Sequence, residues 1–358
     1  MTPQASRLSD DHTAEGYNPF VDPAGLGVRT IGSDAFSGEL LEVLRLSSDL
    51  GTPGEIEPLV RERCAKFAEA SLAGLAPIVR VERAFDGRLE VWSRLAEGFR
   101  LSAVLEWAEA RGAAPSLDAA LTIGDRLLSA LASLQSFEQV DGASGHGAIA
   151  IDQIVVSESG SLTLTDYACG TTLAALQWPR ERLWRRFRIA MPPWAGQARF
   201  DHRVDVTQAA MVITSLLAGR VLKNGEYPGH LPVLVSEAVN RSCVDAGAED
   251  RGRLAMWLTA ATELESRIAF RSAAAARDAL REALGHRLKD ANGVGRWLRE
   301  ARGIIEPAPA APVLVPAPRP IVAEEKVEAS APKAAAAEAP STELAQPPGR
   351  LGKWLSRW

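Results

Sequence analysis

The chain has 358 residues, of which 46% are hydrophobic and 24% are charged, and its net charge at pH 7 is −5. These proportions are typical of a soluble globular protein, and the lack of a basic excess argues against nucleic acid as a partner. The three cysteines form neither a disulfide framework nor a zinc-ligand spacing, so they fit a reducing cytoplasm. The sequence shows no signal-peptide pattern and no run of 18 apolar residues, and we therefore expect a cytoplasmic protein.

The first quarter of the chain is rich in strand patterns. Residues 1–25 are polar and acidic, and we expect them to be unstructured. Residues 26–46 have the pattern of strands and turns, and residues 57–75 carry apolar side chains at helical spacing. Residues 78–95 alternate apolar and polar side chains around a central Asp-Gly pair, which predicts a β-hairpin.

The remainder is mainly helical up to residue 302. Helices are predicted over residues 100–110, 116–137, with Ser116 as N-cap, and 204–219, which is apolar enough to be buried. Two short strand patterns interrupt them, at residues 153–156 and 161–165. A strand-rich part followed by a helix-rich part, with a hinge near Glu97 and Gly98, predicts a two-lobed α+β architecture.

The composition changes at the end of the helical part. Proline and alanine dominate there, which predicts a disordered, extended linker. We therefore divide the chain into an unstructured N-terminus (1–25), a small lobe (26–97), a helical lobe (98–303), a linker (304–348) and a basic amphipathic C-terminal segment (349–358).

The stretch "HGAIAIDQIVVSESGSLTLTDYACG", His146 to Gly170, resembles the catalytic loop and metal-binding motif of protein kinases, in particular the bacterial serine/threonine kinase-like group. Active members carry H-R-D-x-K-x-x-N, then two short strands, then D-F-G. The resemblance extends over residues 26–285 and is more specific in the helical lobe. It implies a bilobal kinase-like fold with a small, degraded, strand-rich N-lobe.

Several residues depart from this pattern. Ala148 stands in place of the catalytic aspartate, and Ala150 in place of the lysine that contacts phosphate. A methyl group neither accepts a proton nor binds phosphate. Gln153 replaces the asparagine that holds magnesium, whereas Asp166 matches the metal-binding aspartate, although a strand-end aspartate that caps backbone amides is an equal alternative.

Three further residues match structural positions of the family. His146 matches the histidine of the loop, and Asp205 matches the buried aspartate that anchors the loop backbone. We expect Asp205 to be buried and to accept hydrogen bonds from the backbone near His146. Arg267 matches an arginine whose usual glutamate partner is replaced by Trp194, so it needs another acceptor or water.

The small lobe departs more strongly. Only Gly32 in "IGSDAFSG" fits the glycine-rich loop, and Asp34 in that loop would repel nucleotide phosphates. No strand with the expected lysine precedes the first helix, on which Glu62 is the candidate for the family's helix glutamate.

Two functions from different classes remain open. The first is a pseudokinase, a regulatory or scaffolding module that acts through protein–protein contacts and needs no cofactor. The alternative is a divergent kinase or nucleotidyl transferase, for which Asp166 and Gln153 would bind magnesium and Gly32 would contact ATP.

Two segments are candidates for interaction with a partner. "PRERLWRRFR", residues 179–188, interleaves arginines, including Arg185 and Arg186, with aromatic residues. A helix that packs its apolar residues inward is the favoured interpretation; a bound partner would be an acidic protein or phosphopeptide. The C-terminal segment has apolar residues at helical spacing and flanking cations, and we expect it to dock on a membrane surface or an unknown protein partner unless it is a frayed end. Its interaction residues are Arg350, Lys353, Trp354 and Trp358.

Overall fold

The computed structural model describes residues 25–303, except 35–36, 69, 71, 139–144, 194–199, 289 and 291. The described residues belong to one compact unit, Met1–Glu306. The N-terminal segment, the linker and the candidate interaction residues of the C-terminal segment lie outside them. No helix of this described part is long and apolar enough to cross a membrane.

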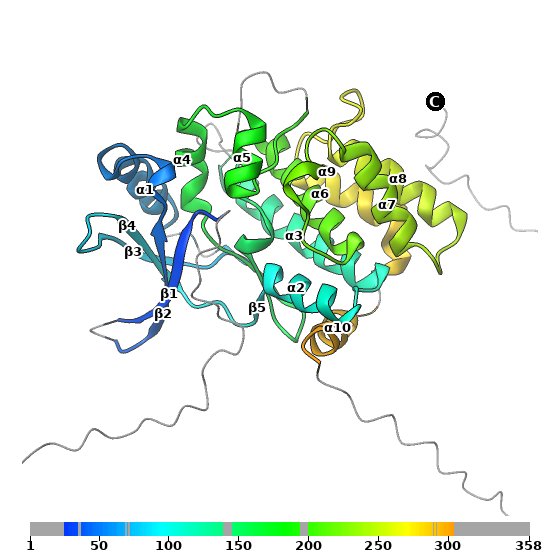
Figure 1. The fold of residues 1–358 in the computed structure, drawn as a ribbon, viewed down its shortest axis with the longest axis horizontal. Helices are drawn as coiled ribbons and strands as arrows, with labels where there is room; N and C mark the ends of the chain where they lie inside the picture. Colours follow the sequence, from blue (N-terminus) through cyan, green and yellow to red (C-terminus); the bar gives the residue numbers. More distant parts are fainter. Residues whose placement is uncertain are drawn as a thin grey trace, which may run out of the picture. The chain divides into compact units, whose positions relative to one another are not determined.

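The small lobe is a four-stranded antiparallel sheet with one long helix (Figure 1). Its strands, in spatial order, are β1 (Gly27–Ser33), β2 (Leu40–Leu46), β4 (Leu89–Arg94) and β3 (Ile78–Arg83). The predicted hairpin is confirmed as β3 and β4, whose turn contains Gly87 at a φ of 81°. Helix α1 (Pro53–Phe67) packs Ile56 and Val60 against the sheet residues Leu44 and Val91.

Helix α1 begins and ends earlier than the sequence pattern suggested. The Glu55 carboxylate accepts a hydrogen bond from the Thr52 N–H, 2.9 Å away, and Pro53 has the fixed φ that suits a first helical position. The helix therefore already includes the residues before Glu57, and it ends at Phe67.

The large lobe begins with a short sheet whose spatial order is β5-β6-β7. Its strands are β5 (Phe99–Arg100), β6 (Ile154–Val156) and β7 (Leu162–Leu164). The helices are α2 (Leu101–Arg111), α3 (Leu117–Glu138), α4 (Gly170–Ala175), α5 (Arg180–Phe187), α6 (His202–Ala218), α7 (Leu231–Ser242), α8 (Ala248–Ala261), α9 (Ala273–Leu284) and α10 (Gly293–Ala301). Helices α4 and α5 lie between the small lobe and the other helices (Figure 1).

Helix α6 is the centre of the large lobe. Every residue from Val204 to Ala218 is buried, as its apolar sequence predicted, and α3, α7, α8 and α9 contact it. The N-cap of α3 is also confirmed, because the Ser116 hydroxyl accepts a hydrogen bond from the Ala119 N–H at 3.2 Å. Helices α3 and α6 contact each other and together support the loop that begins at Gly145.

Candidate functional site

Asp205 on α6 anchors the backbone of the loop at His146. The Asp205 carboxylate is fully buried and accepts hydrogen bonds from the backbone N–H groups of His146 (3.0 Å) and Gly147 (2.8 Å). It also accepts one from Gln135 Nε2 at 3.0 Å. Burial raises the pKa of Asp205, although these N–H donors favour its ionised form. The contact expected between Asp205 and the loop backbone is thus confirmed.

A second anchor on the same helix was not foreseen. Gln208 is fully buried, its Oε1 accepts a hydrogen bond from the Ile149 N–H at 2.9 Å, and its Nε2 donates to the Gly147 carbonyl at 3.2 Å. Gly147 has a φ of 69°, a conformation that favours glycine. Gln208 is one of several polar residues in α6, and nothing local in the sequence marked it as a contact of the loop.

His146 is held as a neutral side chain. It is completely buried, and its Nδ1 accepts a hydrogen bond from the Ala148 N–H at 3.3 Å. Burial, together with the nearby Arg63 guanidinium, lowers the pKa of His146 to about 4. The imidazole therefore shapes the loop without carrying a charge at neutral pH.

Ala148 and Ala150, which the kinase resemblance aligns with catalytic residues, are part of a hydrophobic core. Ala148 and Ala150 are 0% and 5% exposed, respectively. They share one apolar cluster with Ala168 from the large lobe and with Leu44 and Val60 from the small lobe. Residues of both lobes thus share this cluster, to which the loop contributes small apolar side chains.

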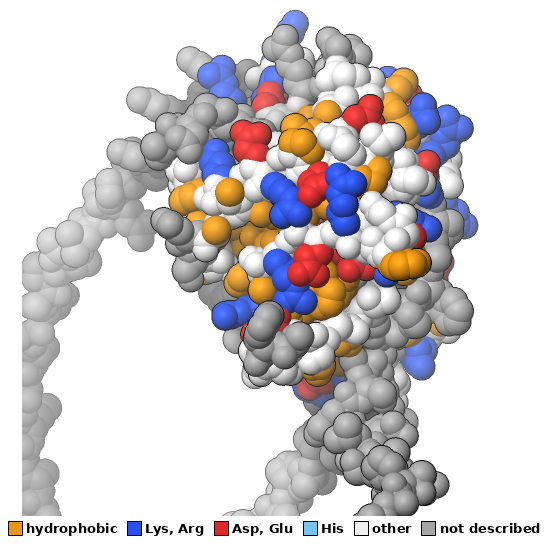
Figure 2. Space-filling model, turned by 90° about the vertical axis from the view of Figure 1, so that its left-hand side faces the viewer, with side chains coloured by type: hydrophobic (Ala, Val, Ile, Leu, Met, Phe, Trp, Pro, Cys, Tyr) orange, Lys and Arg blue, Asp and Glu red, His pale blue; other side chains and the backbone are white. Residues whose placement is uncertain are grey.

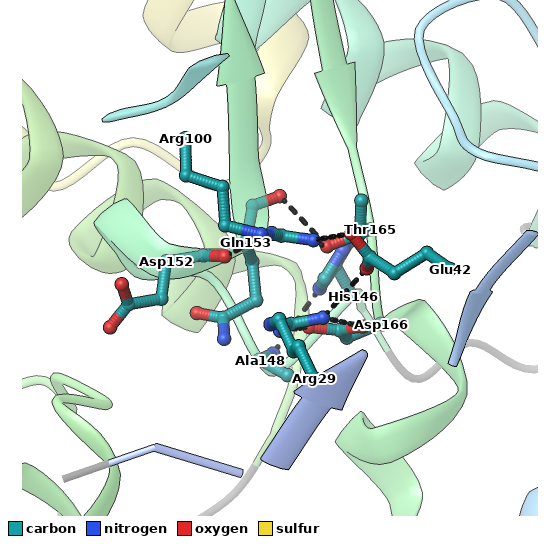
Figure 3. A network of polar contacts seen from close by, with 9 residues as sticks. All are labelled: Arg29, Glu42, Arg100, His146, Ala148, Asp152, Gln153, Thr165 and Asp166. Carbon is teal, nitrogen blue, oxygen red and sulfur yellow. Dashed lines mark hydrogen bonds and ion pairs between the residues drawn. The ribbon is translucent and has the colours of Figure 1, made fainter. Parts of the chain in front are cut away.

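Asp166 lies in a buried ion pair with an arginine of the small lobe (Figure 3). The Arg29 guanidinium on β1 donates to both carboxylate oxygens of Asp166, with a distance of 3.1 Å from Nη1 to Oδ1. Nη1 also donates to the Glu42 carboxylate at 2.9 Å. Burial raises the pKa of Asp166, but the Arg29 guanidinium outweighs it and holds that pKa below its ordinary value.

Arg100 extends this network across the hinge (Figure 3). It donates to the Glu42 carboxylate in the small lobe and to the Asp152 carbonyl in the large lobe, and it lies 3.3 Å from Thr165 Oγ1. Glu42 therefore accepts hydrogen bonds from two arginines, although it is only 4% exposed. A buried carboxylate needs such partners, because an unpaired charge is costly inside a protein.

Gln153 is in a 3₁₀ turn, Ile151–Gln153, and is 1% exposed. Its backbone carbonyl accepts a hydrogen bond from the Thr165 N–H at 2.9 Å, which joins the turn to the residue before Asp166. Among the residues that the structure describes, no group of three His, Cys, Asp or Glu side chains is arranged to hold a metal ion.

Two more arginines join the lobes. Arg63 on α1 is 4% exposed and donates to the backbone carbonyls of Tyr167 (3.2 Å) and Gly145 (2.9 Å). Arg186 on α5 donates to the carboxylate of Asp49 in the small lobe. We refer to Arg29, Arg63, Arg100 and Arg186 as the interlobe arginines.

The sequence offered partial signals for these residues. Arg63 lies four residues before Phe67 on the apolar stripe of α1, which already placed it on the buried face. Glu62, the expected helix glutamate, is exposed instead, so the buried charge on this helix is positive. Nothing local in the sequence identified Arg29 as the partner of Asp166.

The other expected small-lobe contacts differ from those of a glycine-rich loop. Gly32 lies within β1, and a Cβ there would come within 2.7 Å of the Trp92 ring, so packing requires the glycine. The Asp34 carboxylate forms an ion pair with Arg80, whose guanidinium lies 4.0 Å from the Trp92 ring centroid. Gly32 and Asp34, at the β1 end of the β1–β2 pair, therefore make their contacts within the small lobe.

The remaining predictions for the large lobe concern Arg267, its replaced partner Trp194 and the apolar residues of α5. Arg267 is exposed, so water can solvate its guanidinium, which is one of the two outcomes expected for an arginine without its glutamate partner. Trp194 lies outside the described residues. In α5, Leu183, Trp184 and Phe187 are buried, which confirms the inward packing of its apolar side chains.

Comparisons with known proteins find similarity in structure only. No family model matches the sequence, and no curated protein matches it either. Among solved structures, the PknI kinase domain of Mycobacterium tuberculosis superposes with a TM-score of 0.51 at 18% identity, covering 73% of this chain and 91% of that chain. A second crystal structure of that domain gives the same TM-score and identity, covering 72% of this chain and 91% of that one. The chain therefore has a protein-kinase-like bilobal fold.

Proposed function

We propose that this chain is a pseudokinase, a regulatory or scaffolding module that transfers no phosphoryl group and acts through protein–protein contacts. The observation that carries the proposal is the buried ion pair between Arg29 and Asp166. In the kinase family the aspartate at this position binds the magnesium ions that bridge the nucleotide phosphates. Here an arginine side chain of the same molecule already neutralises that carboxylate.

The side chains at this position do not fit a magnesium–nucleotide complex. Mg²⁺ requires oxygen ligands in near-octahedral geometry and is usually held by one or two carboxylates plus phosphates. Both Asp166 oxygens accept hydrogen bonds from Arg29, and the Gln153 side chain is buried in the loop. A magnesium–nucleotide complex at Asp166 would have to displace the Arg29 guanidinium, and Glu42 would then keep only Arg100 as its counter-ion.

The loop supports the same proposal. A positioned general base typically contributes about 10²–10⁴-fold to the rate of proton transfer, and Ala148 provides none. The methyl groups of Ala148 and Ala150 instead contribute to the apolar contact between the lobes. We propose that the fold is maintained by this contact and by the interlobe arginines, without a requirement for a cofactor.

Radiolabel transfer from ATP labelled at the γ-phosphate, with magnesium and with manganese, tests the proposal on the chain itself and on generic protein substrates. We expect no incorporation above that of a heat-denatured sample. Incorporation that disappears in the Asp166→Asn variant would instead establish the alternative, a divergent kinase. Transfer of a nucleotidyl group, detected with ATP labelled at the α-phosphate, would establish a nucleotidyl transferase.

A further inference from the structure

Helix α5 carries a dense positive charge on a chain whose net charge is negative. Over residues 180–188 the only acidic side chain is Glu181. The arginines of this segment are Arg180, Arg182, Arg185, Arg186 and Arg188. Glu181 pairs with Arg180, and Asp49 of the small lobe pairs with Arg186. The surface of α5 thus retains an excess of positive charge, whereas the whole chain has a net charge of −5.

Two of these arginines are presented outward. Arg182 and Arg185 are exposed, because α5 directs Leu183, Trp184 and Phe187 inward. Arg185 uses its Nε to donate to the Glu181 carbonyl at 3.3 Å. Arg182 makes no side-chain hydrogen bond or ion pair with any other residue that the structure describes. Both can therefore form new contacts without breaking an existing ion pair of their own.

Arg182 is also held in a fixed orientation. Its guanidinium lies 3.6 Å from the centroid of the Trp178 ring, and that ring stacks on Phe187 with a centroid distance of 5.6 Å. Stacking on an aromatic face leaves the edge of the guanidinium, with its N–H donors, directed away from the ring. A planar fork held in this way loses less side-chain entropy when it binds a carboxylate in bidentate geometry.

The arrangement distinguishes between classes of ligand. Single-stranded nucleic acid binds to basic surfaces through aromatic faces on which bases stack. Here Trp178 is covered by Arg182 and Phe187, and Trp184 is buried, so neither ring offers a face. Arg182 and Arg185 are three residues apart in α5, a rise of about 4.5 Å along the helix, and Arg188 follows at the C-cap. A row of separate single charges suits this spacing better than one phosphate group.

We propose that α5 is a docking surface for an acidic peptide segment of a partner protein, rich in Asp and Glu, with Arg182 and Arg185 as the principal contacts. The proposal rests on the regulatory function proposed above and names the kind of partner for it. The remaining arginines hold the surface in place: Arg186 joins it to the small lobe, and Arg188 donates to the Asn224 side chain.

The small lobe supplies a matched control. Figure 2 shows on that side Lys and Arg side chains beside Asp and Glu side chains, with hydrophobic patches between them. Arg61 and Arg83 are about half exposed there, and both pair with Glu57. An Arg61→Ala/Arg83→Ala variant therefore changes the net charge as much as Arg182→Ala/Arg185→Ala does, but at a different surface.

The experiment measures binding of the full-length chain to a fluorescein-labelled peptide of alternating Glu and Ala, by fluorescence anisotropy. We expect saturable binding that weakens as the salt concentration rises. The Arg182→Ala/Arg185→Ala variant should bind roughly tenfold more weakly, and the Arg61→Ala/Arg83→Ala variant should bind like the unchanged chain. Circular dichroism verifies that both variants are folded.

Equal affinity of the two double variants would overturn the proposal, and so would absence of binding to the acidic peptide. Tighter binding of a single-stranded oligonucleotide, or of a phosphoserine peptide with the same total charge, would replace the acidic peptide with that ligand class. The same samples are assayed for radiolabel transfer. Radiolabel transfer from ATP by a chain that binds the acidic peptide would contradict only the pseudokinase function. Absence of both radiolabel transfer and peptide binding would contradict only the docking surface.

Discussion

The Arg29 guanidinium and the Asp166 carboxylate form a buried ion pair between the two lobes, although they are 137 positions apart in the sequence. Asp166 is where the kinase resemblance places a metal ligand, and Arg29 comes from the first strand of the small lobe. The lowered pKa of Asp166 keeps the carboxyl ionised, so the arginine is its counter-ion at neutral pH. The ion pair therefore joins the two lobes at neutral pH.

Replacement of Arg29 by Ala should destabilise the chain strongly. Removing one partner of a buried pair leaves an uncompensated charge, and here Asp166 and Glu42 both lose a donor, so we expect a loss of about 3 kcal/mol or more in the free energy of unfolding. Urea denaturation measures this change. Arg45→Ala is the control, because Arg45 pairs with Glu90 at the surface and should cost less than about 1 kcal/mol. Equal effects of the two substitutions would contradict a special role for Arg29.

Asp205→Ala should also be costly. It leaves the N–H groups of His146 and Gly147 buried without an acceptor, and each such group costs about 1–3 kcal/mol. Asp201→Ala, which removes the exposed N-cap of the same helix, should cost only about 1 kcal/mol. Thermal or urea unfolding compares the two variants. If Asp205→Ala is the milder of them, Asp205 does not anchor the loop.

His146 makes stability depend on pH. Its pKa is about 4 in the folded chain and about 6.5 in an unfolded one, so the unfolded chain binds more protons between these values. The contribution is complete above about pH 6.5 and is lost as the pH falls to about 4, by up to about 3 kcal/mol. Other buried acids, Asp205 among them, titrate as well, so the quantity to measure is the difference between the unchanged chain and His146→Gln. Parallel unfolding profiles for the two chains would show that His146 does not titrate in this way.

Two glycines should respond in opposite directions to alanine. Gly32→Ala places a Cβ 2.7 Å from the Trp92 ring inside the sheet, which should cost about 1–3 kcal/mol. Gly54→Ala, in the first turn of α1, meets no atom within 4 Å and should stabilise the chain by up to about 1 kcal/mol. Unfolding curves of both variants test the interpretation that Gly32 is required for packing. A neutral Gly32→Ala variant would leave its role open to a ligand contact.

Much of the fold could be predicted because it depends on local patterns. The alternation around the Asp-Gly pair predicted β3 and β4, and the apolar run of α6 predicted its burial. The spacing between His146 and Asp166 suggested the kinase-like order, and the contact of Asp205 with the loop followed from it. Helix α1 was placed too late because the capping contact of Glu55 begins the helix ahead of the apolar stripe.

The site itself depends on contacts between residues far apart in the chain. The partner of Asp166 is on β1, and Arg100 reaches Glu42 across the hinge. Such pairings are set by how the lobes pack, and no local pattern contains that information. The substitutions at Ala148 and Ala150 were visible in the sequence, whereas their place in an apolar contact between the lobes was visible only in the structure.

The most direct test of the account is isothermal titration calorimetry of the full-length chain with ATP in the presence of magnesium. Because Arg29 neutralises Asp166 and strands β1, β2, β3 and β4 carry no lysine to contact the phosphates, we predict no binding heat up to millimolar nucleotide and no rise in the melting temperature. A nucleotide present at 100 times its dissociation constant would stabilise the chain by about 2.7 kcal/mol, which thermal unfolding would detect readily. Micromolar binding of Mg·ATP that is lost in Asp166→Asn would contradict the account.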